Sequence, residues 1–259
     1  MNDEMKLKII EELQKIEETE DVKIIMSVES GSRAWGFASP DSDYDVRFIY
    51  VRKEADYLRL DRVRDVIEWR LDTVFDISGW DVKKSLQLLY HANPTIMEWC
   101  VSPIVYTETE EAEWIKQIQP HYFSAKKSLF HYWHMADSNY RNYLKGDEVQ
   151  LKKYLYVLRP LLAAQWILDK QSCPPVRFDE LLDAELENEM RPAVHRLLEI
   201  KKNVPEMETV PKIGIINEYA ERKLEEIKGV AKNMDDMETK WQPLNQLFLN
   251  IVNDQDFVK

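Results

Sequence analysis

Hydrophobic and polar residues follow two different patterns in the two parts of this chain. Up to about residue 107, short apolar or alternating runs of strand length are separated by turn-forming residues. Beyond about residue 110, apolar residues recur every three or four positions, as on one face of a helix. We therefore expect an α+β protein, with a small mixed β-sheet domain over residues 1–107 followed by an all-helical domain over residues 108–259.

The first part begins with a charged amphipathic helix, in which Leu7, Ile10 and Leu13 (with Ile9 and Ile16) are expected to form the apolar face. Four later segments have the length and the β-branched or aromatic content of strands: residues 22–28, 44–51, 65–71 and 73–77. After the last of them, Ser78-Gly79 is expected to lead into a helix over residues 80–90.

The second part is expected to consist of helices with almost no strand. Its segments with helical spacing are residues 110–119, 124–145, 151–170, 178–200, 213–228 and 244–252.

Composition places the chain among ordinary globular proteins. Apolar residues make up 44% of its 259 residues, and no run approaches the roughly 18 apolar residues needed to span a bilayer. The N-terminal segment lacks the apolar stretch of a secretory signal. Cys100 and Cys173 lie far apart and outside any close Cys or His spacing, so we expect neither a disulfide framework nor a zinc module. These features predict a cytoplasmic protein without membrane association.

The net charge of −12 limits the kind of nucleic acid that the protein could bind. A protein that grips long duplex DNA normally presents an electropositive face, because neutralising phosphates supplies most of the affinity. We therefore expect no binding to extended duplex DNA. An RNA end, a small molecule or a protein is still compatible with the charge.

The residues suited to phosphate and metal chemistry are concentrated between residues 30 and 51. An apolar strand ends at Gly31-Ser32, where glycine allows a sharp turn close to an anion and a following helical turn would offer free N–H groups. Ten residues separate Ser32 from Asp43. Asp43 and Asp45 then open the next strand two positions apart, so both carboxylates are expected on one face. Arg47 shares that face, either as a phosphate contact or as an ion-pair partner of an Asp.

Convergent carboxylates beside a phosphate cradle favour Mg²⁺, which prefers oxygen ligands. Two ions about 3.5–4 Å apart can activate an attacking hydroxyl and stabilise a departing pyrophosphate. We therefore expect two Mg²⁺ ions, replaceable by Mn²⁺, held by Asp43, Asp45 and a third carboxylate. Asp76 is the first candidate for the third, because a charge in such a strand-like run is unfavourable unless it binds a metal. Glu68 and Asp81 are alternatives, although Asp81 also suits the first turn of a helix.

Gly31-Ser32 followed by Asp43-Tyr44-Asp45 resembles the signature of the DNA polymerase β-like nucleotidyltransferase superfamily. The longer string over residues 31–51, GSRAWGFASPDSDYDVRFIYV, is similar to one branch of it: nucleotidyltransferases of bacteria and phages linked by gene association to RNA repair. Residues 76–81 and 93–106 resemble the same branch. The resemblance is close over residues 20–106 and looser over the helical part.

The resemblance implies a Mg²⁺-dependent enzyme that moves a nucleoside monophosphate from a nucleoside triphosphate to an acceptor hydroxyl, with an RNA end among the acceptors. It implies a helical domain that closes over nucleotide and acceptor. Together with the residues themselves, it gives catalysis and metal binding to Asp43, Asp45 and Asp76, with Glu68 and Asp81 still open as the third carboxylate. Triphosphate binding is expected at Gly31, Ser32, Arg33 and Lys153. Lys153 belongs to a basic and aromatic cluster with Lys152, Tyr154 and Arg159.

Other functions stay open at this point. The chain could be a nucleotide-binding or antitoxin-like regulatory module without turnover, or a transferase that acts on a small molecule or a protein. A Mg²⁺-dependent phosphohydrolase with Asp43 as nucleophile would need Asp-x-Asp at the end of the first strand, where this chain has Gly31-Ser32.

Overall fold

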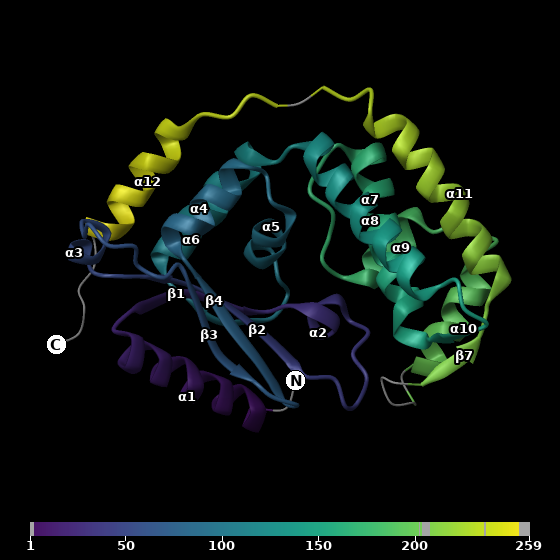
Figure 1. Cartoon of the computed structure of the whole chain (residues 1–259), viewed down its shortest axis with the longest axis horizontal. Helices are drawn as coiled ribbons and strands as arrows, with labels where there is room; N and C mark the ends of the chain where they lie inside the picture. Colours follow the sequence, from purple (N-terminus) through teal and green to yellow (C-terminus); the bar gives the residue numbers. More distant parts are fainter. Residues whose placement is uncertain (1–2, 202, 204–207, 236, 254–259) are drawn as a thin grey trace. The chain divides into compact units, whose positions relative to one another are not determined.

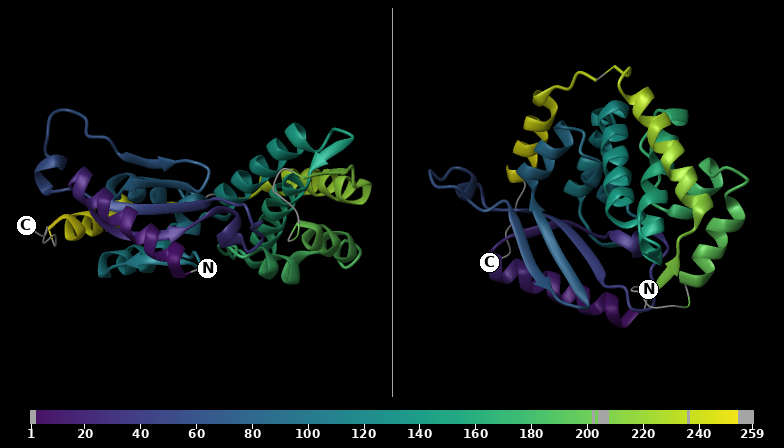
Figure 2. Two further views of the ribbon diagram at one scale, coloured as in Figure 1. Left: turned by 90° about the horizontal axis from the view of Figure 1, so that it is seen from below. Right: turned by 45° about the vertical axis from the view of Figure 1, so that its right-hand side comes forward.

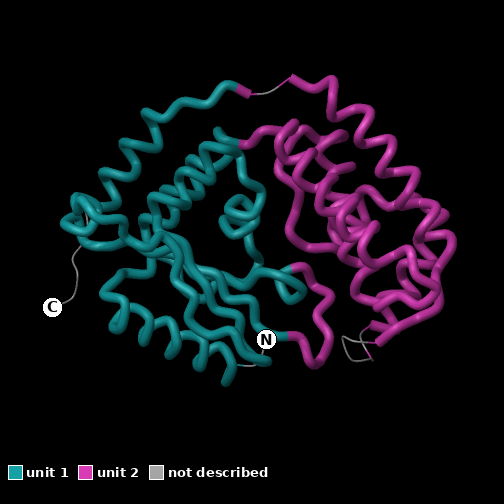
Figure 3. Tube along the Cα trace, viewed as in Figure 1, with its two compact units in different colours: residues 1–34, 43–122, 238–259 teal, residues 35–42, 123–237 magenta. Residues whose placement is uncertain are grey.

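The computed structural model describes residues 3–201, 203, 208–235 and 237–253 (Figure 1). The chain forms two compact units, and neither is one continuous stretch of sequence (Figure 3). Unit 1 comprises residues 1–34, 43–122 and 238–259, and unit 2 comprises residues 35–42 and 123–237. Unit 1 carries a β-sheet and unit 2 is mainly helical, so the predicted α+β fold class is confirmed.

Unit 1 is built on a five-stranded sheet with the strand order β3-β4-β2-β1-β5. The strands are β1 (Lys23–Glu29), β2 (Tyr44–Val51), β3 (Val66–Leu71), β4 (Phe75–Asp81) and β5 (Val105–Glu108). Strands β2 and β4 run parallel, and the other neighbouring pairs are antiparallel. The first residues of β2 therefore lie between the end of β1 and the beginning of β4.

Helices cover both faces of this sheet. Helix α1 (Asp3–Glu20) packs on one face, and α4 (Val82–Tyr90) and α6 (Glu110–Ile118) pack on the other, as Figure 2 shows. Helix α12 (Trp241–Asn253) returns to unit 1 and lies against α4 and α6. The remaining elements of this unit are short: α2 (Gly31–Trp35), α3 (Glu54–Tyr57), α5 (Pro94–Cys100) and a 3₁₀ turn (Gln119–Tyr122).

The apolar face of α1 is only partly the predicted one. Ile9, Leu13 and Ile16 are buried in a core with Val22 and other residues of the sheet. Leu7 is 61% exposed, so its place on the buried face was a wrong prediction. Ile9 is four residues before Leu13 and Ile16 is three residues after it, so these three side chains lie on the same face of the helix. Leu7 is two residues before Ile9 and lies on a different face.

Strand β4 continues through Ser78-Gly79, where the sequence predicted a turn. Gly79 lies opposite Phe48 of β2, and a Cβ atom on Gly79 would lie 2.2 Å from the Phe48 ring. The glycine therefore makes room for an aromatic ring inside the sheet and does not end the strand. The helix begins only at Val82, so its predicted start at residue 80 was wrong.

Over its described residues, unit 2 packs five helices around its own core, which contains Phe37, Leu158 and Ile216. The helices are α7 (Ala125–Tyr143), α8 (Leu151–Lys170), α9 (Phe178–Glu185), α10 (Arg191–Lys201) and α11 (Gly214–Ala231). Two short antiparallel strands, β6 (Glu148–Gln150) and β7 (Thr209–Pro211), were not predicted.

The single helix predicted over residues 178–200 was wrong, because the structure divides it into α9 and α10. Leu186 adopts an extended conformation with a ψ of 125°. Pro192 is the second residue of α10, within the first turn that tolerates a missing N–H group.

The compact units differ from the expected division at residue 107. Helix α6 packs on β1 and α12 on α4, so both belong with the sheet. Residues 35–42 join unit 2, where Phe37 is buried in the core and the ammonium of Lys201 donates a 2.6 Å hydrogen bond to Ser39. Helical spacing identifies a helix but does not tell which core it packs against. Over the described residues, no helix combines the length and the apolar character needed to cross a membrane.

Candidate active site

The turn at Gly31 brings the end of β1 against the beginning of β2. The N–H of Ser30 donates a 2.8 Å hydrogen bond to the carbonyl oxygen of Asp45. Gly31 has a φ of 58°, in the left-handed region, and a Cβ atom there would lie 1.9 Å from Oδ2 of Asp45. Glycine is required here both by the backbone conformation and by the neighbouring carboxylate. Ser32 follows, buried in the single turn of α2.

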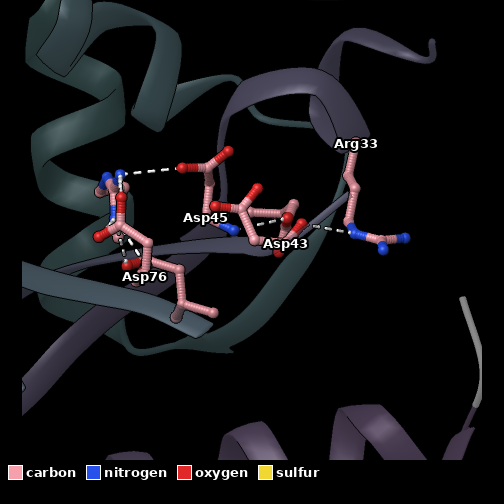
Figure 4. A network of polar contacts seen from close by, with 7 residues as sticks. Arg33, Asp43, Asp45 and Asp76 are labelled. Carbon is pink, nitrogen blue, oxygen red and sulfur yellow. Dashed lines mark hydrogen bonds and ion pairs between the residues drawn. The ribbon is translucent and has the colours of Figure 1, made fainter. Parts of the chain in front are cut away.

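Asp45 and Asp76 are direct neighbours on the parallel strands β2 and β4. The guanidinium of Arg47 lies between them, because its Nη2 is 3.0 Å from Oδ1 of Asp45 and 2.7 Å from Oδ2 of Asp76. Its Nη1 donates a further hydrogen bond to Asp76 Oδ1 at 2.9 Å. Figure 4 shows these contacts, with Asp43 beside the other two carboxylates. Of the two roles open to Arg47, the structure shows the ion pair.

Burial raises the pKa of Asp45 to about 6, although Arg47 opposes this shift. The neighbouring charges of Asp43 and Asp76 act in the same direction as burial. Like charges brought close together disfavour ionisation, so the site favours additional positive charge.

Glu29 is a buried carboxyl group of this site that the sequence analysis did not identify. It is 1% exposed, its Oε1 accepts a 3.0 Å hydrogen bond from the N–H of Asp45, and its Oε2 accepts one from the hydroxyl of Tyr106. Burial raises its pKa to about 7. The available signal was a charged residue at the end of an apolar strand, directly before Ser30-Gly31. Glu29 thus fixes the backbone of Asp45 from the other side of the turn.

Arg33 contacts the backbone and an aromatic ring in this structure. Its Nε donates a 2.8 Å hydrogen bond to the carbonyl oxygen of Asp43, and its guanidinium lies 3.8 Å from the centre of the Tyr44 ring. Figure 4 shows the side chain directed away from the three carboxylates. A contact between Arg33 and phosphate stays a prediction.

Only one of the three candidates for the third carboxylate lies beside Asp45. Glu68 is exposed on β3, opposite Ser78. Asp81 is buried at the opposite end of β4, where its side chain accepts hydrogen bonds from the N–H of Lys83 and the hydroxyl of Tyr57. Asp81 therefore caps helix α4, and Asp76 is the carboxylate that the sheet places next to Asp45.

Lys153 belongs to unit 2, and its ammonium lies 3.8 Å from the centre of the Tyr143 ring and 5.4 Å from that of Tyr156. Tyr154 and Arg159 of the expected cluster are buried in that unit's core. The cluster is therefore not one exposed surface, and a triphosphate contact by Lys153 stays a prediction.

The carboxylates have the chemistry of a Mg²⁺ site, although a cationic side chain lies between two of them here. Over the described residues, no three His, Cys, Asp or Glu side chains are arranged to share one metal ion. Asp45 and Asp76 already converge on one positive charge, the guanidinium of Arg47. Their oxygen atoms are of the type that Mg²⁺ prefers, so the donor chemistry suits the ion, and in this structure the guanidinium of Arg47 lies between the two carboxylates.

Comparison with known proteins gives a family match over nearly the whole chain. Residues 5–250 match the model of a family described as the RNA repair pathway DNA polymerase beta family. This match confirms the resemblance to polymerase β-like nucleotidyltransferases. The chain is also 43% identical over 253 residues to the uncharacterized protein YcgL of Bacillus subtilis (strain 168), covering 96% of this chain and 97% of that protein.

Among solved structures, the chain is similar to a nucleotidyltransferase-like protein from Exiguobacterium sibiricum 255-15. The alignment covers 97% of this chain and 81% of the other, with 13% identity and a TM-score of 0.31.

Proposed function

The chain belongs to the RNA repair pathway DNA polymerase beta family, and from this premise we propose that it is a Mg²⁺-dependent nucleotidyltransferase. The proposed reaction moves a nucleoside monophosphate from a nucleoside triphosphate to an acceptor hydroxyl. The family's description favours an RNA end as acceptor.

One observation carries the proposal: the turn at Gly31-Ser32, which we call the phosphate turn, is in direct contact with the carboxylates. Gly31 lies directly against the carboxylate of Asp45, and Asp45 lies beside Asp76 on the neighbouring strand. A nucleotide whose phosphates lie at the N–H groups following Gly31 would therefore have its α-phosphorus near both carboxylates.

Each residue has a defined part in the proposed reaction. Gly31 and Ser32 hold the triphosphate, and Asp43, Asp45 and Asp76 hold Mg²⁺. When bound, Mg²⁺ supplies Lewis-acid stabilisation of the charge on the transferring phosphoryl group. The acceptor oxygen forms a bond to the α-phosphorus while the bond to pyrophosphate breaks, and Asp76 accepts the proton of the hydroxyl. The two ion pairs of Arg47 must open before these carboxylates can act.

The test is a transfer assay with purified protein, Mg²⁺ or Mn²⁺, each α-labelled nucleoside triphosphate, and pooled tRNA or short RNA. We expect label on RNA with the unaltered chain, and a loss of at least about 100-fold with Asp43→Asn/Asp45→Asn or with Asp76→Asn. Glu68→Gln is the matched control, because it neutralises an exposed carboxylate of the same sheet.

The outcome separates the proposed function from its alternatives. Undiminished transfer by the Asp43→Asn/Asp45→Asn protein would contradict the proposed site. Metal-dependent nucleotide binding without transfer to RNA would redirect the search to a small-molecule or protein acceptor. Tight nucleotide binding without metal dependence or turnover would instead favour a regulatory module.

A further inference from the structure

Unit 1 contains a cation-lined cavity at the end of the sheet opposite to the carboxylate site. The cavity has a volume of about 320 Å³ and lies where β2 and β4 end. Asp76 and Asp81 are five residues apart on β4, which corresponds to about 17 Å of strand. The segment that joins β2 to β3 and carries α3 extends beyond the end of the sheet and lines the cavity (Figure 2). The cavity is therefore separate from the candidate active site.

Positive charge exceeds negative charge around the cavity, although the whole chain carries a net charge of −12. Its lining contains four aspartates and six basic residues, a formal excess of two positive charges. The basic residues are Arg52, Arg59, Arg62, Arg64, Lys83 and Lys84. A positive cavity in an acidic protein attracts anions locally.

Three of the six cations are neutralised by neighbouring carboxylates. Arg59 pairs with Asp61 at 2.6 Å, Arg64 with Glu20 at 2.8 Å and Lys84 with Asp65 at 3.4 Å. Over the described residues, no carboxylate forms an ion pair with the side chains of Arg52, Arg62 or Lys83. Arg62 and Lys83 are also exposed, so a ligand can reach them. The guanidinium of Arg52 lies over the Tyr50 ring, 5.2 Å from its centre.

Arg52 gives a second, independent indication of a ligand. Its Nε is buried and, over the described residues, has no hydrogen-bond acceptor. Its two Nη atoms reach only backbone carbonyl oxygens of Glu20 and Arg64, both at 3.4 Å, which is long for a hydrogen bond. The Arg52 side chain as a whole is half-buried, but its Nε–H lies in a buried position without an acceptor. Such a donor is unfavourable, and the oxygen atoms of an anion would supply acceptors for the guanidinium.

The charges of Arg52 and Asp81 interact, but over the described residues no lining carboxylate accepts a hydrogen bond from the Arg52 side chain. Oδ1 of Asp56 lies 3.6 Å from Nη1 of Arg59. Both oxygens of Asp81 already accept hydrogen bonds, from the N–H of Lys83 at 2.8 Å and from the hydroxyl of Tyr57 at 3.0 Å. Asp65 pairs with Lys84, and Asp61 pairs with Arg59.

We propose that this cavity binds a phosphate group through Arg52, Arg62 and Lys83, as a second anion site of unit 1. Guanidinium groups bind phosphate oxygens through paired hydrogen bonds, and an ammonium adds a point charge. The phosphate can come from a free ion or from the backbone of an RNA strand. The proposal does not depend on the transfer reaction, because neither the three aspartates of the active site nor a metal takes part in it.

The test compares binding in EDTA, without divalent metal, to three probes: inorganic phosphate, pyrophosphate and a fluorescent single-stranded RNA of 12 nucleotides. The test variant is Arg62→Glu/Lys83→Glu, and both residues are exposed. The matched control is Arg196→Glu/Lys145→Glu, an identical change of charge at exposed positions of unit 2. A neutral pair, Arg62→Gln/Lys83→Gln, serves if the charge reversal impairs folding.

We expect the unaltered chain and the control to bind at least one probe, and the test variant to bind it at least about tenfold more weakly. If RNA is the ligand, the slope of log K against log salt should fall by about 0.7, since the site binds one phosphate and each phosphate of a single strand contributes about 0.7. Inorganic phosphate binding without RNA binding would identify a free ion instead.

Equal binding by the test variant and the control, or no binding of any probe by the unaltered chain, would overturn the proposal. Adding Arg62→Glu/Lys83→Glu to the Asp43→Asn/Asp45→Asn protein should weaken binding by the same factor as in the unaltered chain, because the two sites are separate. Failure of the transfer reaction and failure of this site are therefore distinguishable.

Discussion

Gly31 is restricted both by its left-handed backbone conformation and by the Asp45 carboxylate beside it. Gly31→Ala should lower the free energy of unfolding by about 2–5 kcal/mol. The alanine would have to adopt a left-handed conformation, and its Cβ would overlap the carboxylate of Asp45. Gly36→Ala is the control, because Gly36 also has a positive φ, of 86°, but the nearest atom to an added Cβ lies 3.8 Å away. Urea unfolding measures both. Equal losses would show that the carboxylate does not restrict the turn.

Arg47 is expected to compete with metal for the same carboxylates. Arg47→Gln removes its charge-assisted hydrogen bonds to Asp45 and Asp76, and should lower the free energy of unfolding in EDTA by about 1–3 kcal/mol. The same variant should bind Mn²⁺ about tenfold more tightly by calorimetry, because the two carboxylates lose their cation. Arg196→Gln, at an exposed position of unit 2, is the control. Unchanged or weaker Mn²⁺ binding would mean that Arg47 does not compete with the ion.

At the residue scale, the structure can be compared with the sequence only for which side chains lie together. Gly31 and Asp45 were predicted to lie together, and the structure places them in contact. Asp76 was chosen over two alternatives because of its apolar neighbours, and it does lie beside Asp45. Glu29 was missed, because its role depends on a hydrogen bond to Tyr106 that joins two strands far apart in sequence.

The contact between helix α6 and strand β1 is predicted to depend on pH. Burial opposes ionisation of Glu111, but its 2.7 Å ion pair with Lys23 and a hydrogen bond from Thr109 outweigh this and lower its pKa to about 2. The pKa is lowered from 4.5, so the ion pair stabilises the fold fully above about pH 4.5. That stabilisation is lost as the pH falls towards 2.

Glu111→Gln should therefore lower the free energy of unfolding by about 2 kcal/mol at pH 7, a value reduced for the partial exposure of Lys23. The difference from the unaltered chain should shrink between pH 4.5 and pH 3. Glu113→Gln, in the same helix but half-exposed, should have little effect at any pH. A difference for Glu111→Gln that does not vary with pH would rule out the ion pair as its cause. Urea midpoints at pH 7, 4.5 and 3 measure this.

Helices and strands were predicted best where the spacing of their own apolar residues determines their conformation. Strand β2 and helix α8 begin and end at the predicted residues. Errors arose where a distant residue decides the conformation. Gly79 reads as a turn in the sequence, yet it continues a strand because the Phe48 ring lies over it. Strand β5 was missed because a strand of four residues gains its stability from its neighbour β1.

For the whole molecule, helix α12 is expected to stabilise unit 1 although it follows unit 2 in sequence. Leu244, Leu247 and Ile251 are buried, and Trp241 stacks on Tyr90 with ring centres 3.6 Å apart. Removing residues 238–259 should lower the stability of unit 1 by roughly 5 kcal/mol. Hydrogen exchange should show lost protection in α4 and α6 and unchanged protection in α7 and α8.

Equal loss of protection in both units would show instead that the units unfold together. Trp241→Ala is the milder companion variant, with an expected loss of about 1 kcal/mol from the aromatic pair.

The division into units is the feature that the sequence could predict least. The change from strand to helical spacing near residue 110 is real, and it marks a change of element type. It does not mark the edge of a compact unit, because α6 and α12 are helices that pack on the sheet. Which core a helix joins depends on contacts between residues far apart in the chain.

The path of the chain between the two units limits how genetic recombination could exchange one of them. It passes between the units four times, after residues 34, 42, 122 and 237. No continuous stretch of the gene therefore encodes either unit alone, and a single recombination could not exchange one for a foreign version. An exchange of residues 123–237 alone would leave residues 35–42 behind and remove the core in which Phe37 is buried. A foreign version of residues 123–237 would therefore have to supply a core that fits the loop beside Gly31-Ser32.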